Sequence, residues 1–321
     1  DRILALHPRK VLEIGCGTGM LLSRIAPRVA RYHGCDLSEH AVAHIQRLKA
    51  RFPDLAGVTA AHAPAHRATR NAGHYDTVVL NSVVQYFPSA AYLEDVLTGA
   101  LAGLEGPGSL FIGDVRNHAL FRMFHCAVAD ARAEERPSRE ELRRRTEQAM
   151  ANDNELLVHP SFFLEFAAGV PRVTGVEIHV KPGSYRNELS LFRYDVVMEI
   201  DGARPTAAAV PWLDWRDAKG TLEGVREAIL AARERGEEVE LAYTDVPNAR
   251  LLQAEALERW AFGEGAPEPE DGAIPSAVDP EALHRLAAEL GVSARLSWAR
   301  GAASGAFDLW IGGREIGRAH V

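Results

Sequence analysis

The sequence is poor in cysteine, in positive charge and in long apolar runs. Three cysteines are present, Cys16, Cys35 and Cys126, and their spacing fits no metal site, which predicts free thiols, no bound metal and a reducing, cytoplasmic location. The formal net charge of −8 disfavours nucleic-acid binding, because contact with phosphates usually requires a basic face. No apolar run approaches the length of a membrane span, and an apolar fraction of 47% is typical of a globular protein.

The chain also lacks an initiating methionine, because it begins at Asp1. At the other end, residues 315–321 read like the translation of a common sequencing adapter, with an ordinary polar tail as the alternative. We therefore expect residues 315–321 to be a scar and the chain to be an open reading frame cut from a longer gene.

One short stretch carries most of the functional information. Residues 11–19 read Val-Leu-Glu-Ile-Gly-Cys-Gly-Thr-Gly, which is typical of a buried parallel strand followed by a tight turn into a helix. Glycine permits that turn and lets the backbone approach a ligand closely. The amides of such a turn, at a helix N-terminus, favour polar or anionic ligand groups. A dinucleotide fingerprint would need a further glycine where Met20 stands.

Strands and helices alternate over the first two hundred residues, which predicts an α/β fold built on a parallel sheet. Strands are expected over residues 10–14, 31–35, 58–62, 74–80, 110–112, 176–181 and 191–200, the last two as an antiparallel hairpin. Helices are expected over residues 20–29 and 39–51. A capping box at residues 138–141 opens a charged helix that runs to about Met150, and residues 119–170 are expected to form a helical lid.

An acidic residue follows the second expected strand. Asp36 lies about 20 positions after the glycine turn, where a carboxylate can accept both ribose hydroxyls of an adenosyl group. The alternative role for Asp36 is to cap the helix over residues 39–51. Polar residues also follow the fourth and fifth strands, at 81–86 and 113–118, and ligands bind at that edge of a doubly wound sheet.

Two features of these residues together resemble a known family. Glu13 followed by G-x-G-x-G resembles motif I of class I S-adenosylmethionine (SAM) methyltransferases. Residues 81–88, 113–116 and 187–194 resemble the methyltransferase domains embedded in nonribosomal peptide synthetases, and residues 155–163 resemble the lid of that family. The N-methyltransferase branch is the nearest match. The resemblance implies a Rossmann-like, seven-stranded class I methyltransferase sheet with a helical lid insertion.

The resemblance implies SAM as cofactor and S-adenosylhomocysteine as product. The residues expected to hold the cofactor are Glu13, Gly15, Cys16, Gly17, Gly19, Asp36, Leu37, His66, Asn81 and Ser82. Many methyltransferases bind the adenine amine through an aspartate after the third strand, but residues 62–66 read His-Ala-Pro-Ala-His here. The adenine contact is therefore open between a backbone amide and a side chain such as His66, and a surface imidazole is an equal alternative for either histidine.

By the same resemblance, the acceptor is an aminoacyl group held as a thioester on a carrier protein's phosphopantetheine arm. Glu188 and Asn187 are expected to orient its amine. Asn81, Tyr86 and Asp114 are expected to shape the acceptor pocket. Arg116 could hold Asp114 or a substrate carbonyl, or form a surface salt bridge.

Other functions compete with N-methylation. Methylation of carbon would need a general base such as His118 or Glu188. O-methylation of a tethered intermediate and methylation of a free small molecule are further alternatives. A non-catalytic spacer between synthetase domains is disfavoured by the intact glycine turn and Asp36.

The sequence predicts a methyltransferase domain over residues 1–201 and a small α/β subdomain over residues 202–314. A Pro/Ala linker is expected at residues 202–211. Helices are then expected over residues 221–235, 248–260 and 280–290, and strands over residues 239–243, 294–298 and 306–311. The stretches at 245–250 and 278–281 resemble the segment that follows such domains in hybrid assembly lines. The expected role is structural, or a link to neighbouring synthetase domains.

Overall fold

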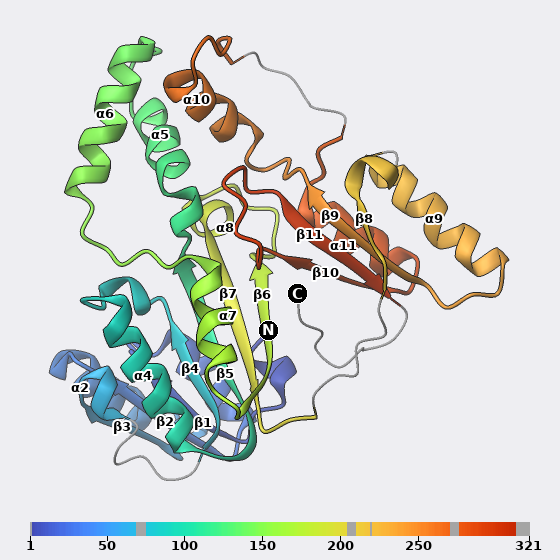
Figure 1. The fold of residues 1–321 in the computed structure, drawn as a ribbon. Helices are drawn as coiled ribbons and strands as arrows, with labels where there is room; N and C mark the ends of the chain where they lie inside the picture. Colours follow the sequence, from blue (N-terminus) through green and yellow to red (C-terminus); the bar gives the residue numbers. More distant parts are fainter. Residues whose placement is uncertain (1, 69–74, 204–209, 219, 270–275, 313–321) are drawn as a thin grey trace.

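The computed structural model describes residues 2–68, 75–203, 210–218, 220–269 and 276–312, so the predicted scar at 315–321 lies outside the described residues. One mixed sheet runs through the described part of the chain in the order β3-β2-β1-β4-β5-β7-β6-β10-β11-β9-β8 (Figure 1). The strands are β1 (Lys10–Ile14), β2 (Arg31–Asp36), β3 (Val58–His62), β4 (Tyr75–Asn81), β5 (Leu104–Arg116), β6 (Val173–Val180), β7 (Arg193–Ile200), β8 (Trp212–Asp214), β9 (Glu240–Val246), β10 (Ser293–Ser297) and β11 (Phe307–Gly312). The α-helices are α1 (Met20–Ile25), α2 (Glu39–Arg51), α3 (Ala65–Ala68), α4 (Ala90–Gly103), α5 (Phe121–Ala131), α6 (Arg139–Asn152), α7 (Pro160–Ala168), α8 (Glu188–Phe192), α9 (Leu222–Glu234), α10 (Leu252–Phe262) and α11 (Pro280–Glu289).

The N-terminal part of the sheet is parallel. β1 pairs with β2 and β4, β2 with β3, and β4 with β5, all in parallel, whereas β7 runs antiparallel to both β5 and β6. On one face Val11 is buried with Ile45 of α2, and on the other Leu12 is buried with Leu93 of α4. Because both faces are covered, these strands read as nearly continuous apolar runs. The predicted α/β fold is confirmed.

The C-terminal part of the chain continues the same sheet. β10 pairs antiparallel with β6 at Ser297 and His179, and β11, β9 and β8 follow outward. One cluster of buried apolar side chains extends from Leu12 in β1 to Leu309 in β11. The sheet and the core of the described residues therefore cross the predicted boundary after residue 201. The division into two domains stays a prediction.

Several elements differ from their expected bounds. The helix expected over residues 20–29 ends at Ile25, and a 3₁₀ turn follows, because Pro27 cannot donate to a helical carbonyl. Residues 191–192 end the short helix α8 rather than beginning β7, because Asn187 caps that helix. In the C-terminal part, β8 was not expected and pairs in parallel with β9.

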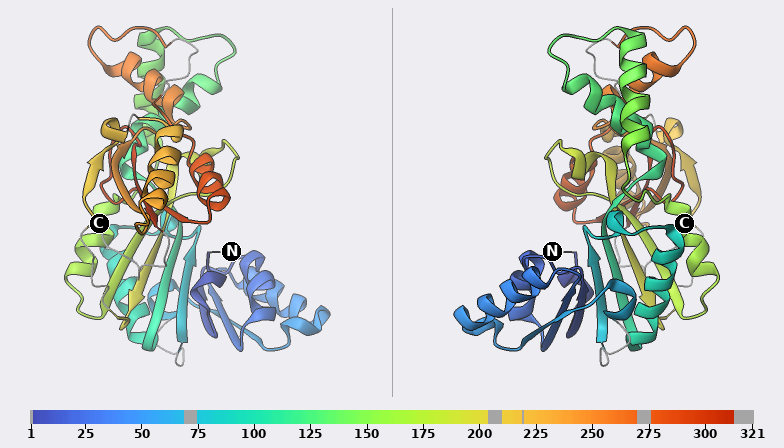
Figure 2. Two further views of the ribbon diagram at one scale, coloured as in Figure 1. Left: turned by 90° about the vertical axis from the view of Figure 1, so that its right-hand side faces the viewer. Right: turned by 90° about the vertical axis from the view of Figure 1, so that its left-hand side faces the viewer.

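The helical insertion between β5 and β6 consists of α5, α6 and α7. Figures 1 and 2 show α5 and α6 side by side beyond the edge of the sheet, with α10 from the C-terminal part next to them. A small apolar cluster that includes Cys126, Leu142 and Leu257 joins these three helices. The action of the insertion as a lid stays a prediction.

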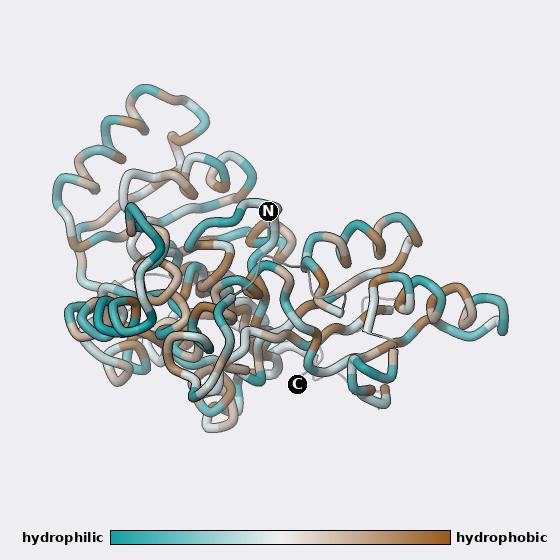
Figure 3. The backbone as a smooth tube through the Cα atoms, turned by 90° about the horizontal axis from the view of Figure 1, so that it is seen from above, coloured by the Kyte–Doolittle hydropathy of each residue, from teal (hydrophilic) through white to brown (hydrophobic). Residues whose placement is uncertain are grey.

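Hydrophobic and hydrophilic residues are interleaved along the tube of Figure 3. In keeping with this pattern, no helix in the described ranges combines the length and the apolar character that crossing a bilayer requires.

Candidate cofactor and acceptor site

The glycine turn after β1 has the left-handed backbone that its sequence predicts. The φ angles of Gly15, Gly17 and Gly19 are 78°, 51° and 82°, values that side-chain-bearing residues rarely adopt. A Cβ atom on Gly15 would lie 2.6 Å from Cγ2 of Val83, so the turn packs tightly against the loop after β4. A Cβ atom on Gly17 would meet no described atom within 4 Å. The turn therefore packs against the protein at Gly15 and leaves open space beside Gly17.

The turn amides are less available to a ligand than the sequence predicts. The amides of Gly15 and Cys16 both donate to the Cys35 carbonyl, at 2.8 and 3.0 Å. The Gly17 amide donates to Asp36 Oδ2 at 2.8 Å, and the Gly19 amide donates to the Cys16 carbonyl at 2.9 Å. In this structure the four amides stabilise the turn. A ligand could reach the turn at the open space beside Gly17.

Asp36 joins the glycine turn to the start of α2. Its Oδ2 accepts from the Gly17 amide and its Oδ1 accepts from the Ser38 amide, both at 2.8 Å. The N-cap of α2 is Ser38, whose hydroxyl oxygen accepts from the Ala41 amide at 3.3 Å. The alternative role of Asp36 as the helix cap is therefore wrong, because Ser38 performs it.

Two predicted cofactor residues next to the turn have buried side chains. Glu13 is 3% exposed, and its Oε2 accepts from the Tyr32 hydroxyl at 2.7 Å. Burial raises the pKa of Glu13 to about 8, so the carboxyl is mostly neutral near pH 7. The Cys16 side chain packs in the apolar cluster with Leu22. The contacts that the structure gives these side chains are to the core, and their role with a cofactor stays a prediction.

The raised pKa of Glu13 predicts a pH-dependent stability. The folded protein holds this proton up to about pH 8, while the unfolded chain releases it near pH 4.5, so the stability contributed by the neutral carboxyl is full below 4.5 and is lost as the pH rises through 8. Glu13→Gln should flatten the decline in the free energy of unfolding between these values, as measured by urea unfolding at several pH values. If the free energy of unfolding declined equally steeply with pH in Glu13→Gln, the decline could not be due to Glu13.

The two histidines near the end of β3 make contacts within the chain, and a role for either in binding adenine stays a prediction. His66 is turned toward α4, where its Nδ1 lies 2.9 Å from the Tyr92 hydroxyl. His62 lies nearer to Asp36, because its Nε2 is 2.9 Å from the Leu37 carbonyl oxygen. Leu37 and Met20 are each 72% exposed, an unusual position for two large apolar side chains beside a glycine turn.

Polar side chains from β4 and β5 meet at the carboxyl edge of the sheet. Asp114 lies within β5, which runs past the expected end at residue 112, with a register shift. Its Oδ2 accepts from Ser82 Oγ at 2.5 Å and from Asn81 Nδ2 at 3.4 Å. Ser82 and Asp114 have φ angles of 54° and 58°, and such strained backbones often occur at functional sites. The structure thus brings together three residues that were predicted for this edge.

A lysine holds Asp114 in place. Lys181 Nζ lies 2.6 Å from Asp114 Oδ1 and 2.8 Å from Asp195 Oδ1, and Arg2 pairs with the other oxygen of Asp195 at 2.7 Å. Burial favours the neutral form of Asp114, but the Lys181 ammonium outweighs it and holds the pKa of Asp114 below its usual value. Asp114 is therefore a hydrogen-bond acceptor at neutral pH and not a proton donor.

The acceptor residues predicted on α8 lie beside a second ionic group. Glu188 is 42% exposed on its side chain and pairs with Arg193, whose Nη2 lies 2.5 Å from Oε1. Asn187 caps α8 through its Oδ1, which accepts from the Ser190 amide at 3.1 Å. Arg193 also helps to lower the pKa of Asp114, so its charge acts on both acidic residues, Asp114 and Glu188.

Arg116 is buried and pairs with Asp153 rather than with Asp114. Its guanidinium forms a two-pronged pair with Asp153, at 2.8 and 2.6 Å, and His125 Nε2 lies 2.9 Å from the same carboxylate. Of the expected roles for Arg116, binding of Asp114 and a surface salt bridge are replaced by an internal ion pair, and contact with a substrate carbonyl stays a prediction. A cavity of about 430 Å³ is lined by residues of this group and by Glu188.

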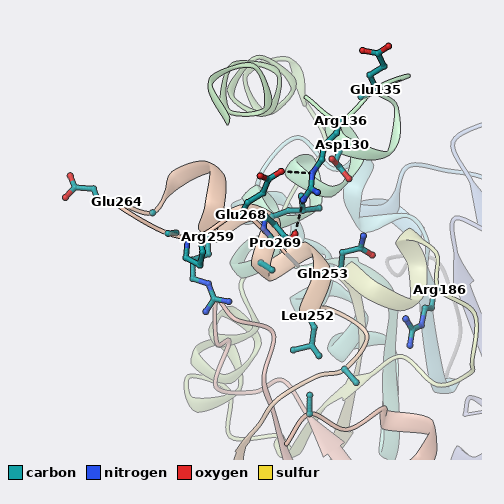
Figure 4. Close-up of a pocket in the computed structure, with 18 of the residues that line it drawn as sticks. Asp130, Glu135, Arg136, Arg186, Leu252, Gln253, Arg259, Glu264, Glu268 and Pro269 are labelled. Carbon is teal, nitrogen blue, oxygen red and sulfur yellow. Dashed lines mark hydrogen bonds and ion pairs between the residues drawn. The ribbon is translucent and has the colours of Figure 1, made fainter. Parts of the chain in front are cut away.

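Tyr86 and His118 lie at the rim of the site. Tyr86 is exposed in the 3₁₀ turn after β4. The exposed ring of His118 lies edge-on to His159 of the helical insertion, with 6.4 Å between ring centroids. A more spacious hollow than the one beside Arg116, of about 1370 Å³, lies elsewhere, between the end of α5 and α10. Figure 4 shows it lined by charged side chains of both signs, with Arg136 turned toward Glu268.

Comparison with known proteins finds a family whose members resemble the part of the chain that contains the glycine turn and Asp36. Residues 12–109 match the protein family described as "Methyltransferase domain". This part of the chain thus belongs to a methyltransferase domain. The match includes the glycine turn, Asp36 and Asn81, and it ends before Asp114, Asn187 and Glu188.

The whole chain is similar to parts of much longer proteins. It is 41% identical to chondramide synthase of Chondromyces crocatus over 317 residues, which is 97% of this chain and 8% of the synthase. It is 29% identical to cyclosporin synthetase of Tolypocladium inflatum over 91% of this chain and 2% of that protein. The chain thus spans less than a tenth of the length of either relative. Among solved structures, N-methyltransferase NodS from Bradyrhizobium japonicum is 15% identical with a TM-score of 0.44, and the alignment covers 63% of this chain and 85% of NodS.

Sequence reasoning missed part of the acceptor side of this methyltransferase chain. Lys181 and Asp195, which fix Asp114, were given no role, and Arg193 was noted only within a resembling stretch. The sequence does carry a signal for Asp195, because this charged residue interrupts the apolar run of β7. In the structure Asp195 is only 4% exposed. A buried charge of that kind requires a partner.

Proposed function

We propose that this chain is the SAM-dependent N-methyltransferase domain of a nonribosomal peptide synthetase. Its substrate is the α-amine of an aminoacyl or peptidyl thioester on a carrier protein's phosphopantetheine arm. The observation that carries the proposal is that the glycine turn, which Asp36 joins, packs against the loop after β4, where Ser82 donates to Asp114. Similarity to chondramide synthase over 97% of the chain supports a synthetase context, with neighbouring synthetase domains as partners.

The residues around the glycine turn fit SAM. Each Asp36 oxygen accepts one backbone amide, which leaves further lone pairs for two ribose hydroxyls. The exposed side chains of Met20 and Leu37 give an apolar surface for an adenine ring. The open side of Gly17 lets the ligand lie against the backbone. When bound, SAM supplies a methyl group that its sulfonium already activates.

The chain itself aligns the acceptor and excludes water. An α-amine has a pKa of about 8, so a useful neutral fraction exists near pH 7 without a strong base. Glu188 and Asn187 orient this amine by accepting its N–H groups. Asn81, Tyr86 and the ionised Asp114 line the pocket that receives it. The hydrogen bonds at these acceptors turn the nitrogen lone pair toward the methyl group.

A product analysis tests the proposal. The protein is incubated with SAM and a panel of aminoacyl-carrier thioesters, and fragmentation mass spectrometry then locates the added methyl group. A methyl on the α-nitrogen supports the proposal. A methyl on carbon or oxygen overturns the assignment of the acceptor atom. Absence of SAM and S-adenosylhomocysteine binding by the folded protein overturns the enzymatic proposal as a whole.

His118 provides a test of the acceptor atom. Because N-methylation needs no strong base, His118→Ala should retain transfer to within about threefold, whereas loss of a general base typically costs about 10²–10⁴-fold. The measurement is the initial rate with a saturating thioester. Complete loss of transfer with SAM affinity and unfolding temperature preserved would favour a carbon acceptor.

A further inference from the structure

The segment between β6 and α8, residues 181–187, is fixed by the C-terminal part of the chain. Arg250 donates through Nη1 to the Lys181 carbonyl at 2.9 Å and through Nη2 to the Gly183 carbonyl at 2.5 Å. Its Nε donates to Asp279 Oδ1 at 3.2 Å, and its side chain is 1% exposed. One buried guanidinium therefore holds the main chain of the segment at two positions.

A second contact from the same region binds the segment at the amide of Gly183, whose carbonyl already binds Arg250. The Gly183 amide donates to Glu281 Oε2 at 3.0 Å. Glu281 stands at the start of α11, where Asp279 is the N-cap. Both the carbonyl and the amide of Gly183 are thus hydrogen-bonded to side chains of the C-terminal part, Arg250 and Glu281.

Arg250 is itself held rigidly. Its amide donates to Asn248 Oδ1 at 3.0 Å, and Asn248 forms a β-bridge with Val278. Asn248 and Arg250 are both buried polar residues. The stretches 245–250 and 278–281, which resemble the segment that follows such domains in hybrid assembly lines, meet at this point.

The fixed segment carries acceptor-side residues at both ends. At its start, the Lys181 side chain bonds to Asp114 and Asp195. At its end, Asn187 begins α8, which also carries Glu188. A shift of the segment would therefore move the partner of Asp114 and the groups proposed to orient the amine.

We infer that Arg250 is a positioning residue for the acceptor in the proposed methyl transfer. The inference rests on the proposed function, because it concerns the same site. Two carbonyl oxygens and a carboxylate are met by the planar fork of a guanidinium, which a lysine ammonium cannot reproduce from the same place. The C-terminal part of the chain is in this sense part of the active site and not only a linker.

The test compares Arg250→Lys with the wild type on the full chain. With an aminoacyl-carrier thioester, kcat/KM should fall at least about tenfold, mainly through KM for the acceptor, while the SAM dissociation constant stays within about twofold. Glu281→Gln weakens the acceptor of the Gly183 amide, so it should also raise KM for the aminoacyl-carrier thioester. Arg226→Ala is the matched control, because Arg226 pairs with Glu289 on the surface of the same region.

Amide hydrogen exchange gives a readout that does not depend on activity. Exchange of residues 181–187 should be faster in Arg250→Lys and unchanged in Arg226→Ala. Unchanged exchange, an equal loss of SAM affinity, or an equal effect of Arg226→Ala would overturn the inference. If the wild type methylates but Arg250→Lys does so equally well, only the inference fails. If the wild type binds SAM but methylates no thioester, the proposed function fails and the inference falls with it.

Discussion

Asp36→Ala should weaken SAM binding at least about 100-fold. Two hydrogen bonds from ribose hydroxyls to a carboxylate contribute about 1.5–3 kcal/mol each, and about 1.4 kcal/mol corresponds to a factor of ten in affinity. The same change removes the acceptor of the Gly17 amide, which loosens the open side of the turn. Isothermal titration with SAM and with S-adenosylhomocysteine gives both dissociation constants directly.

Two matched variants separate ribose binding from local structure. Asp54→Ala removes an exposed aspartate of the 3₁₀ turn after α2 and should leave SAM affinity unchanged. Ser38→Ala removes the N-cap of α2 and should cost about 1 kcal/mol of stability with little change in SAM affinity. If Asp36→Ala binds SAM as tightly as Asp54→Ala does, the assignment of Asp36 to the ribose is wrong.

Lys181→Met should have the largest effect on the fold and on the acceptor. It leaves Asp114 and Asp195 as two buried carboxylates without their shared cation, and breaking a buried pair typically costs about 3–5 kcal/mol. The free energy of unfolding, from urea titration, should fall by that amount. Transfer to the thioester should be lost even at temperatures where the variant remains folded, because Asp114 is then free to take up a proton.

Lys10→Met is the surface control for this change, because Lys10 is an exposed lysine in β1. A rescue variant distinguishes stability from catalysis. Asp195 keeps its ion pair with Arg2, so adding Asp114→Asn alone to Lys181→Met removes the carboxylate that has lost its lysine. This double variant should regain part of the stability without regaining transfer. Full activity in the rescue variant would show that Asp114 has no part in receiving the acceptor.

The cofactor side could be predicted because its signals are local. Three glycines within five positions require a left-handed turn, and Asp36 follows at a spacing that one strand–helix–strand unit fixes. The structure keeps these residues together, but it ends the helix after the turn at Ile25 and gives the cap of α2 to Ser38. What the sequence could not show is that the turn amides bond to Cys35 and Asp36, since this depends on how β1 and β2 align.

The acceptor side could not be predicted in the same way because its contacts cross the sheet. Lys181 lies 67 positions from Asp114 and 14 from Asp195, and the register of β5, β6 and β7 decides that they meet. Arg116 illustrates the limit, because Asp153, its partner, lies 37 positions away beyond α6. Hydrophobic periodicity locates strands, but it does not give the register between strands that are far apart in sequence.

The junction between β6 and β10 limits where the chain can be divided when it is transferred into another protein. A graft that ends at residue 201 would leave the edge of β6 unpaired and would remove the Leu257 face that covers Cys126 and Leu142 on the helical insertion. Exposed strand edges and apolar patches promote aggregation. Recombinant exchange should therefore carry residues 202–312 together with the preceding two hundred, as one transplantable piece.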